Sequence, residues 1–231
     1  TEIVVGIKMQ EELIGLLVLP AKSSGDFFTD DDRELIITLA NEAAVAIKNA
    51  QTYSDAQRAA VRDELTKLYN YRFFQDCLDK EITHHQQTAG SFAIIFMDLD
   101  LFKAYNDIYG HLFGDEALVK VAQAITESIR ATDVAARYGG DEFAVILPET
   151  GLGQAWTVAQ RIKEAIRRYF PGVGGRGQLL TVSLGVAVYP VDGQSKQQLL
   201  AYADQALYQA KRAGRNKVSG RLSSETAAVV V

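Results

Sequence analysis

The most informative stretch of the chain is Arg137-Tyr138-Gly139-Gly140-Asp141-Glu142-Phe143, which lies between the apolar runs Val134 to Ala136 and Phe143 to Leu147. Two short apolar runs joined by a glycine-rich turn predict a β-hairpin. The glycines can adopt positive φ and let a ligand approach the backbone, and the two acids supply the hard oxygen ligands that Mg²⁺ prefers. A tight turn by itself needs no acids, so the pattern favours a hairpin tip that binds a ligand, with an ordinary solvated turn as the alternative.

A second acidic cluster, Asp98-Leu99-Asp100, follows the apolar run Ser91 to Met97. A continuous apolar run of this length predicts a central strand that is buried on both faces. In sheets covered by helices, ligands bind at the carboxyl ends of such strands. We therefore expect Asp98 to face Asp141 and Glu142 across adjacent strands.

The segment from Leu101 to Asp115 predicts a helix that begins directly after these carboxylates and breaks at Gly110 to Gly114. The amides of a helix N-terminus bind phosphate groups well. The backbone from Leu99 to Lys103 is therefore a candidate phosphate site, next to acids that can bind a metal ion.

Three further motifs lie on either side of these residues: Asp63-x-Leu65-Thr66-x-Leu68-x-Asn70, Thr181-Val182-Ser183-Leu184-Gly185-Val186-Ala187, and Ala203-Asp204-x-Ala206-Leu207-Tyr208-x-Ala210-Lys211-x-x-Gly214-Arg215-Asn216. The two acidic segments described above complete a set of five motifs: Asp98-x-Asp100-x-Phe102-Lys103-x-x-Asn106-Asp107-x-x-Gly110-His111-x-x-Gly114-Asp115 and Gly139-Gly140-Asp141-Glu142-Phe143. Together, in this order and spacing, they resemble the diguanylate cyclase (GGDEF) family over roughly residues 63 to 219. Lys67 and Tyr71 depart from the Gly and Arg that are usual in the family.

The resemblance implies an α+β fold with a mixed central β-sheet flanked by helices, as in GGDEF domains and class III nucleotide cyclases. Helical and strand patterns alternate between Asp63 and Val218, which agrees with this fold class. We expect the GGDEF catalytic domain at residues 63–220 and a flexible tail at residues 221–231.

The N-terminal part predicts a hairpin and a long helix. Ile3 to Ile7 and Leu13 to Leu19 are strand-like, and a helix with an acidic first turn begins near Thr29. The run from Leu13 to Asn49 is similar to the C-terminal half of a GAF sensor domain. Residues 1–50 are therefore expected to be the C-terminal part of a GAF-like domain, and residues 51–62 a helical linker resembling a coiled coil.

Within this helix, apolar residues recur at alternating spacings of three and four, which is typical of a coiled-coil seam: Ile36, Leu39, Ala43, Ala46, Ala50 and Tyr53. A separate stripe of Ala40, Ala44 and Ile47 is expected to pack on the sensor sheet. We expect a parallel homodimer through the N-terminal helix. The alternative is one broad apolar face buried within a single protomer, because small Ala residues dominate the seam.

The resemblance implies a diguanylate cyclase, a nucleotidyltransferase that condenses two GTP molecules into cyclic di-GMP and two pyrophosphates in a homodimer. Two Mg²⁺ ions per half-site, with Mn²⁺ as the alternative, are expected on Asp98, the Leu99 carbonyl, Asp141 and Glu142. Asp141 is the candidate that assists deprotonation of the ribose 3′-hydroxyl, with Glu142 mainly a ligand and Asp98 completing the catalytic set. The expected GTP contacts are Phe102, Lys103, Asn106, Asp115, Gly139, Gly140, Lys211 and Arg215.

Selection of guanine is expected to depend on Asn106 and Asp115. A carboxylate can accept hydrogen bonds from guanine N1–H and from the N2 amine, which adenine lacks, so GTP is expected over ATP. Lys211 and Arg215 are four residues apart and would share a helix face if the helix extends to Arg215. Both are expected to reach the terminal phosphates.

The segment Arg130-Ala131-Thr132-Asp133 matches the RxxD inhibitory site of the family, and Arg161 aligns with a second arginine of that site. The resemblance therefore implies inhibition by the product, cyclic di-GMP, at Arg130, Asp133 and Arg161. Without the other motifs, Arg130 and Asp133 would be interpreted as an ordinary surface ion pair.

The composition of the chain indicates which kinds of partner and which cellular location to expect. The net charge of −5 argues against a nucleic-acid-binding surface. Cys77 is the only cysteine, so no intrachain disulfide can form and a cytoplasmic location is expected. No run reaches the roughly 18 apolar residues needed to cross a bilayer, so no membrane segment is expected in this chain. The alternative function is a catalytically silent receptor for GTP or cyclic di-GMP, which the complete set of carboxylates disfavours.

Overall fold

The computed structural model describes residues 2–9, 12–23, 26–88, 90–171 and 180–221, and for residues 53–60 it describes the backbone only. The chain divides into two compact units, Thr1–Ala60 and Val61–Val231. The expected tail, residues 221–231, lies outside the described residues except for Arg221. The elements are β1 (Ile3–Met9), β2 (Glu12–Leu19), α1 (Asp30–Val61), α2 (Tyr71–Thr88), β3 (Phe92–Asp100), α3 (Phe102–Tyr109), α4 (His111–Glu127), β4 (Val134–Arg137), β5 (Glu142–Leu147), α5 (Leu152–Tyr169), β6 (Thr181–Tyr189), α6 (Lys196–Arg212) and β7 (Val218–Ser219).

The first unit contains the predicted hairpin and long helix. β1 and β2 pair in antiparallel fashion. At the start of α1, the Asp32 amide donates to the Thr29 hydroxyl over 3.2 Å, and the Thr29 amide donates to the Asp32 carboxylate over 2.7 Å. This reciprocal cap satisfies two amides that the helix cannot pair internally. Ile7 of β1 packs with Ala40 and Ala44 of α1 in a small core.

The helix α1 differs from the predicted seam at two positions: Ile36 is buried, and Ala43 is partly buried against the core of Ile7, Ala40 and Ala44. The side chain of Tyr53 lies outside the described residues. Ile36 is only 7% exposed, because it precedes Ala40 and Ala44 at a spacing of four and so joins the stripe that is buried in this unit. The predicted packing of Ala40 and Ala44 on the hairpin is correct, whereas Ile47 is exposed. Among the α1 residues whose side chains are described, the exposed large apolar ones are Leu35, Ile37, Leu39, Val45 and Ile47.

The second unit is built on a five-stranded mixed sheet in the order β4-β5-β3-β6-β7. β7 runs parallel to β6, and the pairs β4–β5, β5–β3 and β3–β6 are antiparallel. β3 lies in the middle and is buried along nearly its whole length. A strand covered by helices on both faces has no solvent side, which explains its continuous apolar sequence.

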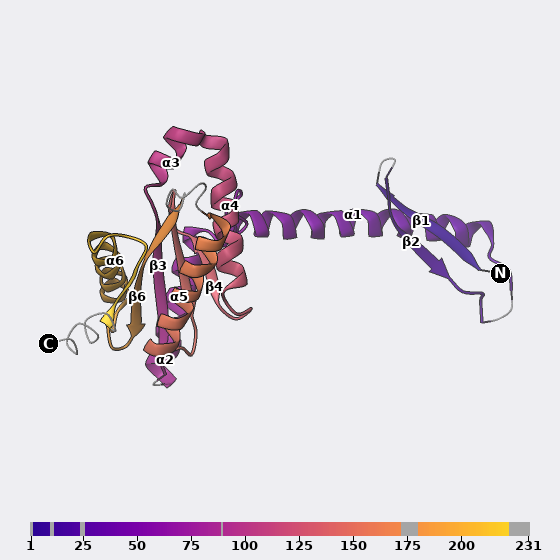
Figure 1. The fold of residues 1–231 in the computed structure, drawn as a ribbon. Helices are drawn as coiled ribbons and strands as arrows, with labels where there is room; N and C mark the ends of the chain where they lie inside the picture. The colour runs from indigo at the N-terminus through magenta and orange to yellow at the C-terminus, as the bar shows by residue number, and fades with distance from the viewer. Residues whose placement is uncertain (1, 10–11, 24–25, 89, 172–179, 222–231) are drawn as a thin grey trace. The chain divides into compact units, whose positions relative to one another are not determined.

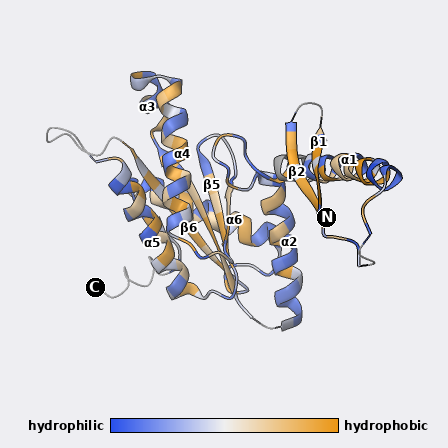
Figure 2. Cartoon of the chain, turned by 90° about the vertical axis from the view of Figure 1, so that its right-hand side faces the viewer, coloured by the Kyte–Doolittle hydropathy of each residue, from blue (hydrophilic) through white to orange (hydrophobic). Residues whose placement is uncertain are grey.

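Helices cover both faces of this sheet (Figure 1). α4 and α5 pack against one face, to which β3 contributes Ile95 and Met97. α2 and α6 pack against the other face, to which β3 contributes Ile94 and Phe96. Figure 2 shows mostly hydrophobic strands between helices that carry both hydrophilic and hydrophobic residues. The predicted α+β fold is confirmed. Because side chains alternate along a strand, Asp98 lies on the face covered by α2 and α6.

The helical region after β3 is interrupted at a single residue. Gly110, with φ of 90°, separates α3 from α4, and Gly114 is a buried residue inside α4. The prediction that the break extends to Gly114 is wrong, because one left-handed glycine is enough to end one helix and let the next begin. Within the described residues, none of the helices has the length and apolar content needed to cross a bilayer.

Candidate active site

Acids from two distant parts of the chain lie opposite each other at one end of the sheet. In the pairing of β3 with β5, Asp98 is the register partner of Glu142. Beside them, the Leu99 amide donates a hydrogen bond to the Asp141 carbonyl over 3.2 Å. This bond holds the turn before β5 against β3, so the backbone positions of Asp98, Asp141 and Glu142 lie next to one another.

The charges of these acids act on one another. Burial raises the pKa of Asp98 above its ordinary value, the Lys211 ammonium opposes this shift, and the charges of Asp141 and Asp100 reinforce it. Partial burial likewise raises the pKa of Glu142, and the charges of Asp98 and Asp141 add to the effect. The raised pKa values mean that the site disfavours its own negative charge, which a bound cation would relieve.

A cation from the protein already lies at this point. Lys211, in the last turn of α6, places its Nζ 2.7 Å from Asp98 Oδ2. Among the described residues, no three His, Cys, Asp or Glu side chains are grouped closely enough to hold a metal ion. The oxygen ligands of Asp98 and Glu142 nevertheless suit a hard divalent ion in kind, and the Lys211 ammonium stands in for its charge.

The two glycines of the turn act differently from the prediction. Neither Gly139 nor Gly140 adopts the left-handed region. A Cβ at Gly139 would lie 2.6 Å from Glu142 Oε2, so a larger residue there would displace the Glu142 carboxylate. The Gly140 carbonyl accepts two hydrogen bonds from the Arg137 guanidinium, at 2.7 and 3.1 Å.

Arg137 is a site residue that the sequence analysis missed. Besides holding Gly140, its guanidinium lies 3.3 Å from the Asp63 carboxylate and so joins the turn to the segment before α2. The sequence carried a signal for this pair, since Arg137 directly precedes the turn and Asp63 opens the first motif. Their spatial relation could not be inferred from that order alone.

The candidate base-binding residues lie where α3 meets α4. Asn106 Oδ1 is buried and accepts no hydrogen bond from the described residues. Gly114 makes room for this oxygen, because a Cβ there would lie only 1.9 Å from it. Asp115, the next residue, is exposed. A buried oxygen without a partner is unfavourable, so the Asn106 side chain carries an unmet hydrogen-bonding capacity in this structure.

The candidate phosphate-binding residues at α3 differ in exposure. Leu101 precedes α3 in the left-handed conformation, with φ of 59°. Phe102 is a buried core residue, so only its backbone can serve a ligand, whereas the Lys103 side chain is exposed. The first turn of α3 therefore offers amides and one cation next to Asp98.

Lys211 and Arg215 do not share a helix face, because the condition for this, a helix that extends to Arg215, is not met. α6 ends at Arg212, and Arg215 follows in a left-handed conformation with φ of 60°. The cause is Gly214, whose φ of 106° ends the helix in the way that is common for glycine. Arg215 is exposed in this segment.

Two of the three candidate inhibitory residues, Arg130 and Arg161, line a separate cavity. The Asp133 carboxylate accepts a hydrogen bond from the Arg130 amide over 2.7 Å, and no ion pair joins these two side chains in the described structure. Arg161 of α5 donates to the Ser128 carbonyl from Nε at 2.8 Å and from Nη2 at 2.5 Å. A cavity of about 370 Å³ is lined by both Arg130 and Arg161.

Comparisons with known proteins agree with the motifs. The family described as "Diguanylate cyclase, GGDEF domain" matches residues 60–217. Diguanylate cyclase A of Treponema denticola is 35% identical over 219 residues, which are 93% of this chain and 58% of that protein. The response regulator PleD of Caulobacter vibrioides is 38% identical over 164 residues, 70% of this chain and 36% of that protein. The chain thus spans about half the length of these relatives or less.

Solved structures give the same result. The coiled coil and GGDEF domain of DgcB from Caulobacter crescentus, in complex with c-di-GMP, matches with a TM-score of 0.70 and 31% identity, over 80% of this chain and 98% of that one. Diguanylate cyclase SiaD from Pseudomonas aeruginosa, in complex with its activator SiaC, matches with a TM-score of 0.64 and 33% identity, over 82% of this chain and 74% of that one. The family match begins at residue 60, so the GAF assignment of residues 1–50 stays a prediction. With well over half of its length matched, the chain belongs to the GGDEF family of diguanylate cyclase domains.

Proposed function

We propose that the protein is a diguanylate cyclase that condenses two GTP molecules into cyclic di-GMP and releases two pyrophosphates. The observation that carries this proposal is the register pairing of Asp98 with Glu142, beside Asp141 and beside the Lys211 ammonium. Acids remote in sequence have little reason to be gathered with raised pKa values unless a cationic ligand uses them. One GTP would be held by each of two copies, and the two reacting groups would meet between them.

The proposed metal ligands are Asp98, the Leu99 carbonyl, Asp141 and Glu142, holding two Mg²⁺ ions, with Mn²⁺ as the alternative. Such ions, when bound, lower the pKa of a hydroxyl nucleophile and neutralise charge on phosphate oxygens. Asp141 would accept the proton of the ribose 3′-hydroxyl. Lys211 would exchange its contact with Asp98 for the terminal phosphates of GTP, together with Arg215 and Lys103, because an ammonium binds either anion.

Recognition of the base is assigned to Asn106 and Asp115. The place of Asn106 supports this assignment, because its side-chain amide lies against Gly114, the residue before Asp115. Its NH₂ group would donate to the Hoogsteen side of guanine, where N7 and O6 accept. The exposed Asp115 carboxylate would accept from guanine N1–H and N2, which adenine cannot offer. GTP would therefore be preferred to ATP. The backbone of Phe102 and the turn at Gly139 and Gly140 would line the phosphates.

A homodimer through α1 is part of the same proposal, since the product needs two half-sites. Exposed Leu35 and Leu39 on α1 supply an apolar surface for a second helix. A dimer raises the effective concentration of one half-site near the other. Leu39→Asp should therefore lower both the dimer fraction in sedimentation equilibrium and the rate per chain, and the rate should return at high protein concentration. A monomeric wild-type chain with full activity would contradict this part.

Product inhibition is proposed at Arg130, Asp133 and Arg161. The cavity lined by Arg130 and Arg161 supports this, because paired arginines bind phosphodiesters through charge-assisted hydrogen bonds. Arg130→Ala should remove the inhibition of initial rates by added cyclic di-GMP. Arg168→Ala, a variant of another arginine on α5, is the control that should remain inhibited. Equal inhibition of both variants would overturn the assignment.

The central test is incubation of the purified chain with GTP and Mg²⁺, and separately with ATP, followed by chromatography of the nucleotides. Cyclic di-GMP should form from GTP alone, and Asp141→Ala and Glu142→Gln should lower the rate by about 100-fold or more. Binding of GTP without pyrophosphate release would instead identify a silent receptor. Equal turnover of ATP would remove the proposed role of Asp115.

A further inference from the structure

Asp100 is a buried carboxylate for which the proposed chemistry has no use. It ends β3, is 6% exposed, and lies on the same face of the strand as Asp98, two residues earlier. Its carboxylate accepts three hydrogen bonds from distant parts of the chain: the Thr181 hydroxyl at 2.7 Å, the Ser183 hydroxyl at 2.7 Å and the Asn216 amide at 3.0 Å. A group this buried and this fully bonded fixes the segments that it joins.

The bond to the Asn216 amide holds an unfavourable stretch of backbone. After α6 ends, Gly214, Arg215 and Asn216 have φ of 106°, 60° and 50°. The left-handed region is unfavourable for residues with a Cβ, and such residues persist only where the surroundings hold them. Asp100 provides that hold at Asn216, and the next residue is held by the hydrogen bond from the Leu184 amide to the Lys217 carbonyl, at 2.9 Å.

This stretch is next to the two cations that the proposed function assigns to the triphosphate. Arg215 lies within it, and the Arg215 amide donates to the Ala210 carbonyl at the end of α6 over 3.1 Å. Lys211 follows Ala210 and places its ammonium on Asp98. A change in the path of residues 214–216 would therefore move Arg215 directly and loosen the helix end that carries Lys211.

We propose that Asp100 is a positioning residue: through the Asn216 amide it fixes the left-handed segment 214–216, and so holds Arg215 and Lys211 where the terminal phosphates of GTP bind. It acts on the substrate only through these residues. The inference rests on the proposed function, because that assigns the two cations to the triphosphate.

The three donors around Asp100 make the proposal specific about substitutions. Hydroxyls can rotate, whereas a backbone amide can only donate. In Asp100→Asn, the amide oxygen can accept from Asn216 and Thr181, and the new NH₂ group can donate to the Ser183 hydroxyl. The held segment should therefore survive this change. Asp100→Ala removes the carboxylate oxygen that accepts from the Asn216 amide and should loosen the segment.

The experiment measures the affinity of each variant for GTP and for GMP by calorimetry in the presence of Ca²⁺. GMP has no terminal phosphates, so it does not report on Arg215 and Lys211. Asp100→Ala should weaken GTP binding by about tenfold, the loss expected for one charge-assisted contact, and leave GMP binding nearly unchanged. Asp100→Asn should restore GTP binding to within about threefold of the wild type, because it retains the Asn216 contact.

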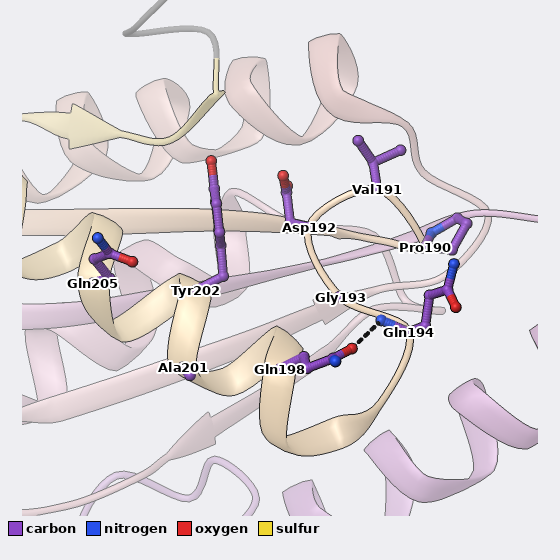
Figure 3. A pocket seen from close by; sticks show the side chains of 9 residues that line it. All are labelled: Pro190, Val191, Asp192, Gly193, Gln194, Gln198, Ala201, Tyr202 and Gln205. Atoms are coloured by element: carbon purple, nitrogen blue, oxygen red, sulfur yellow. Dashed lines mark hydrogen bonds between the residues drawn. The ribbon is translucent and has the colours of Figure 1, made fainter.

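A matched control is available in Asp192, another buried aspartate of the same unit. Its side chain has no exposed surface and accepts from the Val188 amide at 2.9 Å and from the Arg221 Nε at 3.0 Å. It lies on the loop between β6 and α6, beside a cavity of about 520 Å³, with Tyr202 near it (Figure 3). Asp192→Ala should lower thermal stability without changing the ratio of GTP to GMP affinity.

Several outcomes would overturn the inference. Equal weakening of GTP and GMP would indicate a general structural role, and an Asp100→Asn variant as weak as Asp100→Ala would indicate that the charge itself is needed. If Asp100→Ala does not fold, Asp100→Ser replaces it, since its hydroxyl is too short to reach the Asn216 amide. Failure of the wild type to bind GTP would count against the proposed function instead. Even then, hydrogen exchange of the Asn216 amide must be faster in the Ala or Ser variant than in Asp100→Asn, or the inference fails.

Discussion

Gly114→Ala should separate nucleotide binding from stability. The new Cβ would lie 1.9 Å from Asn106 Oδ1, against an ordinary contact distance of 3.4 Å or more, so the Asn106 amide must withdraw by more than an ångström. Replacing a helical Gly by Ala favours the folded state by about 1 kcal/mol. The displaced oxygen has no hydrogen bond to lose, because it accepts none from the described residues. Loss of the contact between the Asn106 amide and guanine would remove about 1 to 1.5 kcal/mol of the free energy of GTP binding, which corresponds to an affinity close to tenfold weaker.

The assay combines thermal unfolding with calorimetric titration of GTP. The midpoint should stay constant or rise by about 2 to 4 °C, while GTP affinity falls by about tenfold. Gly153→Ala is the matched control, because this glycine also lies in a helix and a Cβ there would meet nothing within 4 Å. It should leave GTP affinity unchanged.

A double-mutant cycle then identifies the route of the effect. If Gly114→Ala acts by moving the Asn106 amide, it should weaken GTP binding no further in an Asn106→Ala background. Undiminished GTP affinity in Gly114→Ala, or a full additional loss in the double variant, would refute the assignment of Asn106 to the base.

Three further outcomes are expected. Gly185→Ala would place a Cβ 2.2 Å from a backbone carbonyl of α6, and a backbone carbonyl cannot move aside as a side chain can. This variant should lower the free energy of unfolding by about 2 to 3 kcal/mol in denaturant titration. Gly140→Ala, where the Cβ would meet nothing within 4 Å, should leave the free energy of unfolding unchanged. Lys211→Met should bind Mn²⁺ about tenfold more tightly in electron paramagnetic resonance titrations, because the Lys211 ammonium no longer competes for Asp98. The same variant should bind GTP more weakly. Weaker binding of both Mn²⁺ and GTP would contradict the proposal that the ammonium takes the place of a metal ion at Asp98. The pKa of Glu142 is raised in the folded state, so the folded state binds the proton more tightly than the unfolded chain does. The wild type should therefore lose stability relative to Glu142→Gln as pH rises from about 4 to 7. A constant difference between the thermal unfolding midpoints of the two proteins over this range would show that no such shift exists.

The sequence was sufficient to predict the elements around the site. The continuous apolar run of β3 and the two runs on either side of the glycine-rich turn have the lengths and patterns of strands, and strands were found there. The order and spacing of the motifs were sufficient for the family. The secondary structure is a local property, because hydrophobic periodicity and turn chemistry act within a few residues of the chain.

The contacts within the site could not be predicted in the same way. Glu142 lies opposite Asp98 because of the strand register, and Lys211 reaches Asp98 because α6 covers that face of β3. The partner of Asp100 at residue 216 lies more than a hundred residues away in the chain.

Sequence alone thus determined which segments are strands and helices, which acids the chain carries, and the family to which it belongs. The tertiary structure decided which of those acids meet, that Lys211 reaches Asp98, and that Ile36 is buried rather than part of a free seam. The physical reason is that secondary structure follows from neighbours along the chain, whereas contacts follow from the strand order and register that bury both faces of the sheet at once.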